Sequence, residues 1–449
     1  MNLLRYRLCL GVIFVLALML RLLPLRNPGI DWAIVQVDSW HYTAPAEGLR
    51  AGCGYAAVEN GKCGTAETRF PPGYSVFLTT MPTLRTAVAF QALMGAIVCL
   101  ITAVVVAWFW DYWTALLAAT LMAFDLASVA TGAAIVAEQT FQLTLAALIL
   151  SVAAMILPSG KSRVLPLATI AGILLALAVM IRPTGIFVPI AVVATILIMP
   201  ISWRSRIISL LIVSLLPAAA AIGWTERNVS CCHIHTIANS GANDLYRFKA
   251  AAVVAFSEHE SFEQAQHQLD LALPPNVHAG TDPYELERRA IRIFREHPVA
   301  LAFVTTKGVA VLLFAPAGSF LSRLFGLEWR APSPGLPKDV LEPTLSSLST
   351  SPSMLALVTF QIGLCILVAF GIVFALINVR EMNHAQKELV LICTLMTVVL
   401  LAPNAGGAAK FRMRTHAEPA MVILAAIGLR RAFALVSNIR RGPRRIVYG

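Results

Sequence analysis

Segment 38–74 gathers ionisable, aromatic and turn-forming residues within an otherwise apolar chain. Asp38, Tyr42, Ala46 and Leu49 are spaced three or four residues apart, and Gly52 follows them, so a helix would place these side chains in one stripe. A carboxylate at the start of a helix can take a proton in catalysis, or it can simply cap the free N–H groups of the first turn. Both interpretations of Asp38 stay open, and this segment is the first candidate for an active site.

Arg69 follows in the run Arg69-Phe70-Pro71-Pro72-Gly73-Tyr74. Two prolines and a glycine fix a turn, and we expect this turn to stand where the chain re-enters a membrane. A guanidinium at that depth is suited to binding a lipid phosphate through two hydrogen bonds. Its alternative role is that of an ordinary interfacial arginine whose head reaches toward water.

The elements that must position these residues are apolar helices. The 449-residue chain is 58% hydrophobic and 13% charged, with a mean hydropathy of +0.74, whereas soluble proteins are about 25% charged. These values predict an all-α polytopic membrane protein in which residues 1–449 form one domain, a bundle of about 11 to 13 transmembrane helices with a helical first external loop. We place apolar runs at 8–25, 86–110, 113–130, 136–157, 164–181, 184–200, 207–224, 299–318, 353–378, 388–404 and 417–436.

Three long polar stretches, 26–84, 225–298 and 319–352, interrupt these runs, and we expect all three outside the membrane. The net charge of +11 is concentrated at the two ends of the chain and in short loops, which places both termini in the cytoplasm by the positive-inside rule. An odd number of crossings cannot satisfy that arrangement, so one segment is wrongly assigned. Either run 299–318 is a re-entrant segment or a crossing is hidden elsewhere, and short runs such as 388–404 are equally suspect.

The first apolar run has a basic start and no small-residue cleavage pattern, which is typical of an uncleaved signal anchor. It would deliver segment 26–84 to the periplasm or its equivalent and fix the protein in the inner, or plasma, membrane. Because the basic residues follow the membrane pattern, we expect no nucleic-acid partner.

Four cysteines, Cys53, Cys63, Cys231 and Cys232, lie in the polar stretches predicted to be outside. An oxidising compartment permits a bridge between Cys53 and Cys63, or bridges between the two loops, and the sequence leaves these and free thiols open. No Cys or His spacing indicates a zinc site. A divalent metal is compatible with the sequence but not indicated, and no cofactor is predicted.

Segment 284–296 has apolar residues on one face and charged residues around them. This pattern predicts an amphipathic helix that ends at His297-Pro298, and we expect it to lie against the membrane surface as a structural strut.

The stripe from Asp38 to Gly52, followed by the Arg69 turn, resembles the first external loop of polyprenyl-phosphate-dependent glycosyltransferases of the C superfamily. These include the aminoarabinose transferases and the protein O-mannosyltransferases. Ser39 departs from the second acidic residue of many relatives, and His416-Ala-Glu-Pro419 departs from their usual tyrosine- and arginine-containing form. Further similar segments are Ile135–Phe141 with Glu138, Arg182-Pro183, Trp224–Asn228, Asn239–Tyr246, Ala290–Pro298 with Lys307, and Phe411–Pro419.

The resemblance implies transfer of a sugar from a polyprenyl-phosphate donor to a lipid, glycan or protein acceptor of the cell envelope, at the periplasmic face. Asp38 would be the general base, and a single displacement would invert the anomeric centre. The expected partners are the lipid-linked donor, the acceptor and membrane lipids. The donor phosphate would bind Arg69, Arg227, Arg412 and Arg414, and the substrates would contact Tyr42, Tyr74, Glu138, Asn239 and Asn243.

Simpler roles remain open for several of these residues. Glu138 can pair with Arg182 for structure, and Tyr42 and Tyr74 can belong to an interfacial aromatic belt. A multi-pass transporter or flippase of a lipid-linked sugar is the rival function. Against it, the chain shows no paired halves and few charges in mid-helix.

Overall fold

The computed structural model describes the chain except for residues 28, 276, 278–281, 328–350, 408 and 441–449. Helices dominate it, and the strands in the described part are β1 (Ala56–Glu59) and β2 (Lys62–Ala66), which pair as one antiparallel hairpin. The long helices are α1 (Leu3–Leu22), α5 (Leu84–Phe109), α8 (Glu138–Ile156), α9 (Val164–Ile181), α11 (Trp203–Cys232), α16 (Pro298–Phe314), α19 (Pro352–Ile377), α20 (His384–Leu401) and α22 (Glu418–Arg440).

Shorter helices connect these elements. In the first half they are α2 (Ile30–Ala33), α3 (Trp40–Arg50), α4 (Gly73–Thr79), α6 (Tyr112–Ala123), α7 (Leu126–Gly132) and α10 (Val188–Ile198). In the second half they are α12 (Ser240–Asn243), the π-helix η4 (Asp244–Ala250), α13 (Ala251–Glu258), α14 (Phe262–Leu271), α15 (Pro283–Glu296), α17 (Gly318–Phe325) and α21 (Phe411–Arg414). The 3₁₀ turns are η1 (Leu23–Arg26), η2 (Pro158–Arg163), η3 (Pro183–Phe187), η5 (Val379–Glu381) and η6 (Ala402–Asn404).

Within the described residues, nine helical segments are long and apolar enough to cross a membrane, and the bent pair α6–α7 makes up to ten. Pro183–Ile198 adds a shorter apolar helical stretch. The all-α polytopic fold is therefore confirmed, while the exact number of crossings stays a prediction. Residues 298–325 qualify as one such segment, and most of the predicted external stretch 319–352 lies outside the described residues.

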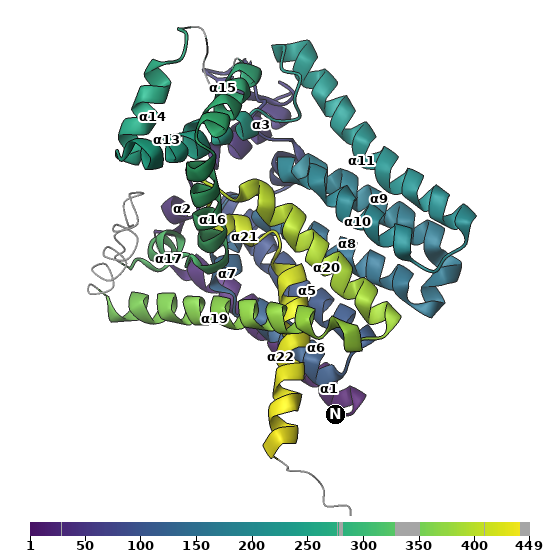
Figure 1. The fold of residues 1–449 in the computed structure, drawn as a ribbon. Helices are drawn as coiled ribbons and strands as arrows, with labels where there is room; N and C mark the ends of the chain where they lie inside the picture. The colour runs from purple at the N-terminus through teal and green to yellow at the C-terminus, as the bar shows by residue number, and fades with distance from the viewer. Residues whose placement is uncertain (28, 276, 278–281, 328–350, 408, 441–449) are drawn as a thin grey trace, which may run out of the picture.

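The polar connections gather at one end of the bundle. α3 belongs to the polar stretch 26–84, here called the first connection, and α13, α14 and α15 belong to the stretch 225–298, the second connection. These helices lie together at the top of Figure 1. The N-terminus lies at the opposite end, and α22 runs toward that end. The N-terminus and the two polar connections thus lie at opposite ends of the bundle, and the orientation in a membrane stays a prediction.

Small residues let the helices approach closely, as is usual in membrane bundles. A Cβ on Gly428 of α22 would lie 1.8 Å from the carbonyl oxygen of Gly371 in α19, so only glycine fits at this crossing. In the first half of the bundle, α1 packs on α5, α5 on α8, α8 on α9 and α9 on α11.

α8 and α9 form an antiparallel hairpin that brings two charges together. Glu138 is the first residue of α8, and Pro183 stops α9 at Ile181, which leaves Arg182 in extended conformation. Because α9 returns alongside α8, the residue that opens one helix meets the residue that follows the other.

The first connection contains the predicted helix, as α3, together with the hairpin β1–β2, which was not predicted. Cys53 and Cys63 form a disulfide that ties the end of α3 to β2. The N-cap of α3 is Ser39, whose hydroxyl donates to the Ile135 carbonyl oxygen (2.7 Å). The capping interpretation of Asp38 is therefore wrong, because its carboxylate pairs with Arg412 instead of the first turn of α3.

The predicted amphipathic helix is present as α15, but the expected contact with the membrane surface is wrong for its central face. Leu286 and Ala290 are 0% exposed and pack with Tyr246 of η4. The apolar face of α15 is thus covered by the protein's own second connection.

The second disulfide joins the neighbouring residues Cys231 and Cys232 at the end of α11, so no bridge links the two connections. Cys9, Cys99, Cys365 and Cys393 are free thiols.

Gly73 provides a test of how the first connection is positioned on the bundle. A Cβ at this position would lie 2.7 Å from the Met180 carbonyl oxygen of α9. We expect Gly73→Ala to lower the free energy of unfolding by about 1–3 kcal/mol through overpacking, measured as a fall in the melting temperature of the purified protein. Gly223→Ala is the control, because a Cβ there meets nothing within 4 Å. Equal melting temperatures for the two variants would contradict this close contact.

Candidate functional site

Four charged residues from distant parts of the chain form a continuous ionic chain at the end of the bundle where the polar connections lie. Asp38 pairs with Arg412 through Oδ2 and Nη2, and Arg412 Nε lies 3.8 Å from Glu138 Oε1. Arg182 Nη1 completes the chain at 2.7 Å from the same oxygen. The ionic chain therefore joins the start of α3, the start of α8, the residue after α9 and α21.

Arg412 keeps Asp38 ionised. Burial alone would raise the pKa of the Asp38 carboxyl, but the charge and hydrogen bond of Arg412, with smaller contributions from Arg69 and Lys410, hold that pKa below its usual value. Reciprocally, burial disfavours the Arg412 cation, and the charges of Glu138 and Asp38 outweigh this effect and raise its pKa. The site thus holds a fixed anion that is exposed on one side, since 15% of the Asp38 side chain remains accessible.

Three aromatic side chains pack against one another close to the ionic chain. Tyr42 is 2% exposed, stacks on Phe70 at 4.9 Å between centroids and meets Tyr74 edge-on at 5.0 Å. The Tyr74 hydroxyl donates to Gln91 Oε1 (2.5 Å). Burial raises the pKa of both tyrosines, so their hydroxyls stay neutral. Tyr42 lies within electrostatic reach of Asp38 and Arg412, whereas Tyr74 is fully buried, and substrate contact by either stays a prediction.

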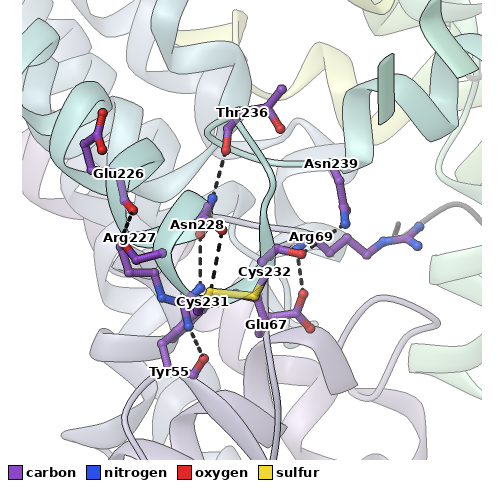
Figure 2. The surroundings of a disulfide bond; sticks show 12 residues. Tyr55, Glu67, Arg69, Glu226, Arg227, Asn228, Cys231, Cys232, Thr236 and Asn239 are labelled. Atoms are coloured by element: carbon purple, nitrogen blue, oxygen red, sulfur yellow. Dashed lines mark hydrogen bonds between the residues drawn. A yellow bond between two sulfur atoms is a disulfide. The ribbon is translucent and has the colours of Figure 1, made fainter. Parts of the chain in front are cut away.

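Arg69 points its guanidinium toward the site. Its backbone N–H donates to Glu67 Oε1 (2.6 Å), and its guanidinium extends away from the Cys231–Cys232 disulfide in Figure 2. The guanidinium lies over the Phe70 ring at 5.8 Å, and its charge acts on both Asp38 and Asp244. It forms no ion pair with any carboxylate of the described residues, so it is available to an anionic ligand.

Arg227 has a different environment. Its guanidinium donates to the carbonyl oxygens of Glu67 and Tyr55, both at 2.6 Å (Figure 2). It also lies over the Trp224 ring, 4.9 Å from the centroid. These contacts fasten the first connection to α11. Its role as a phosphate ligand stays a prediction.

Asn239 also joins the two connections: its backbone N–H and its side chain donate to the carbonyl and hydroxyl oxygens of Thr68, at 3.1 and 3.0 Å. Asn243 is buried, and its side-chain oxygen has no hydrogen-bond partner among the described residues. Direct substrate contact by either asparagine stays a prediction.

Arg414 points away from the ionic chain. It is 2% exposed, donates to the carbonyl oxygens of Leu312, Leu313 and Ala315, and pairs with Glu418 at 3.3 Å. The Arg414 guanidinium is thus bound to the end of α16, and the structure does not bring Arg414 together with Asp38.

Three residues of the site were not among those predicted from the sequence: Arg182, Lys410 and Asp244. Arg182 was named only in the segment Arg182-Pro183 and as the alternative structural partner of Glu138, and the structure contains that pair. Burial raises the pKa of the Asp244 carboxyl despite the opposing charges of Arg69 and Arg412. Its position directly after Asn243, and that of Lys410 two residues before Arg412, were the signals available.

The arrangement combines an ionised carboxylate with Arg69 and Lys410, two cations that form no ion pair with a carboxylate among the described residues. Such a site can bind an anionic group beside a proton acceptor, with the charges already in position. In the described part of the chain, no group of three or more His, Cys, Asp or Glu side chains is placed to hold a metal ion.

No protein-family model and no curated protein sequence matches the chain. Solved structures do. The chain is similar to the archaeal oligosaccharyltransferase AglB from Archaeoglobus fulgidus in complex with an inhibitory peptide and a dolichol-phosphate, with a TM-score of 0.52 and 14% identity over 97% of this chain and 51% of that one. The apo form of the Archaeoglobus fulgidus oligosaccharyltransferase gives a TM-score of 0.53 and 13% identity, with the same coverage.

This chain thus spans about half the length of the oligosaccharyltransferase structures that it matches. At this level of identity the likeness establishes the fold alone. The membrane-helix fold expected from the resemblance to polyprenyl-phosphate-dependent glycosyltransferases is therefore confirmed, and this chain shares it with an oligosaccharyltransferase.

Proposed function

We propose that the protein transfers a sugar from a polyprenyl-phosphate donor to a lipid, glycan or protein acceptor. The observation that carries this proposal is the position of Asp38: an ionised carboxylate held by Arg412, within electrostatic reach of Arg69, which forms no ion pair among the described residues. The shared fold supports it, because one matching structure contains a dolichol-phosphate and a peptide.

The donor phosphate would bind where Arg69 and Arg412 converge. Arg69 has no carboxylate partner among the described residues, and Arg412 has donors beyond the one it gives to Asp38. Fixed cations at this place would stabilise the charge that develops on the departing phosphate.

In the transfer step, the acceptor O–H or N–H would give its proton to Asp38 while the acceptor atom attacks the anomeric carbon. The bond from that carbon to the phosphate oxygen breaks, and its electron pair stays on the phosphate. One displacement of this kind inverts the anomeric configuration. Glu138 and Arg182 would act from behind by holding Arg412 in place.

We place this reaction at the periplasmic face of the inner membrane, or its equivalent. The basic ends of the chain favour the cytoplasm, and the site lies at the end of the bundle away from the N-terminus (Figure 1). The donor's polyprenyl chain would then lie among lipids while its phosphate reaches the site.

Asp38→Asn tests the base. The amide keeps the shape but cannot accept the proton, so we expect transfer of labelled sugar from a polyprenyl-phosphate donor to fall about 10²- to 10⁴-fold. Asp31→Asn is the matched control, because Asp31 lies in the same connection and pairs only with the exposed Arg85. Unchanged transfer by Asp38→Asn would contradict the assignment of Asp38 as the general base. A wild type that is inactive with every lipid-linked donor would favour the rival function, a transporter or flippase.

Arg69→Ala tests the phosphate contact. We expect a loss of about a hundredfold in kcat/KM, partly restored in Arg69→Lys, because a cation facing the leaving phosphate acts mainly in the transition state. The rate is measured in the same transfer assay with Arg85→Ala as control. A loss in Arg85→Ala equal to that in Arg69→Ala would show that the effect is not specific to the site.

Arg412→Gln tests the electrostatic coupling through pH. In the wild type the lowered pKa of Asp38 keeps the base ionised at mildly acidic and neutral pH, so its titration leaves kcat/KM flat from pH 5 to 8. Without the Arg412 charge, burial raises that pKa, and the rate will fall on the acid side within this range. An acid limb at the same pH in wild type and variant would contradict the coupling, whatever the overall loss of rate.

A further inference from the structure

Three charged side chains whose charges act on the site form no ion pair within the described part of the chain: Arg69, Asp244 and Lys410. They differ in this from Asp38, Arg412, Glu138 and Arg182, whose charges are already matched. Arg69 has a place in the proposed reaction, whereas Lys410 has none so far.

Gly406 and Gly407, shortly before Lys410 in the sequence, pack closely against two helices. A Cβ on Gly308 of α16 would lie 2.2 Å from the Gly406 nitrogen, and a Cβ on Gly407 would lie 2.1 Å from the Phe248 carbonyl oxygen of η4. The backbone at Gly406 and Gly407 is therefore fixed between α16 and η4 by contacts that leave no room for a side chain at Gly308 or Gly407.

The Lys410 ammonium lies beside η4. Its Nζ is 5.6 Å from the centroid of the Phe248 ring, and Asp244 lies four residues before Phe248 in the same π-helical turn. The Lys410 side chain is exposed, and its charge interacts with those of Arg412, Asp38 and Asp244. Lys410 therefore lies on the η4 side of the site, within electrostatic reach of Arg412 and Asp38.

We infer that Lys410 is a further ligand of the donor phosphate, which it would bind from the side of η4. This inference rests on the proposed function. The diester phosphate of the donor carries one negative charge, and the departing monoester gains a second as it accepts the electron pair of the broken bond. An ammonium with no carboxylate partner gains most from that second charge, so it would favour the product phosphate more than the donor.

The experiment measures binding directly and needs no acceptor. The full-length protein in lipid nanodiscs is titrated with undecaprenyl phosphate and, separately, with undecaprenol. We expect Lys410→Met to weaken binding of the phosphate about tenfold or more relative to the wild type, since a charge-assisted contact is lost, with binding of the alcohol unchanged. Lys410→Arg keeps the charge and should stay close to the wild type.

Lys249→Met is the matched control. Lys249 belongs to η4, its ammonium lies 5.9 Å from the Phe294 centroid, and burial alone lowers its pKa, with no contribution from the charges of the site. An equal loss of phosphate binding in Lys249→Met, or unchanged binding in Lys410→Met, would overturn the inference alone. A wild type that binds the phosphate and the alcohol equally would overturn both this inference and the proposed function.

Discussion

The contact between Asp38 and Arg412 joins two residues that are 374 positions apart in the chain. Both charges are largely withdrawn from water, and a buried charge is tolerated only when it is paired. Arg412 meets this need by contacting Asp38 and Glu138 at once. The first connection, α8 and α21 must therefore be assembled before the site has its charge arrangement.

Part of this ionic chain is held by the bundle, and Asp38 is held by the first connection. Glu138 and Arg182 are fixed by the α8–α9 hairpin. Pro183 stops α9, so that the last residues of α9 lie beside the first residue of α8. Asp38 instead depends on a connection that is held by the Cys53–Cys63 disulfide, by Arg227 and by the close contact at Gly73. The charge arrangement therefore depends on both the bundle and the first connection.

Hydropathy and helical spacing were enough to predict the membrane helices, α3 and α15, since these depend on local sequence. What a helix packs against could not be read in this way: the apolar face of α15 serves η4 and not the membrane. The sequence could not distinguish the roles of Arg412 and Arg414, which lie two residues apart in the same short segment. In the structure Arg412 pairs with Asp38, whereas Arg414 pairs with Glu418. Lys410 was missed because its neighbour at the site, Phe248 of η4, lies far from it in the sequence.

The central claim is that a sugar leaves a polyprenyl phosphate at this site in one displacement beside Asp38. The most direct measurement is the anomeric configuration of the product, determined by NMR coupling constants after transfer from a polyprenyl-phosphate sugar of known configuration. The account predicts a product of inverted configuration. A product that retains the donor's configuration would contradict it, because retention requires a covalent intermediate or a second displacement.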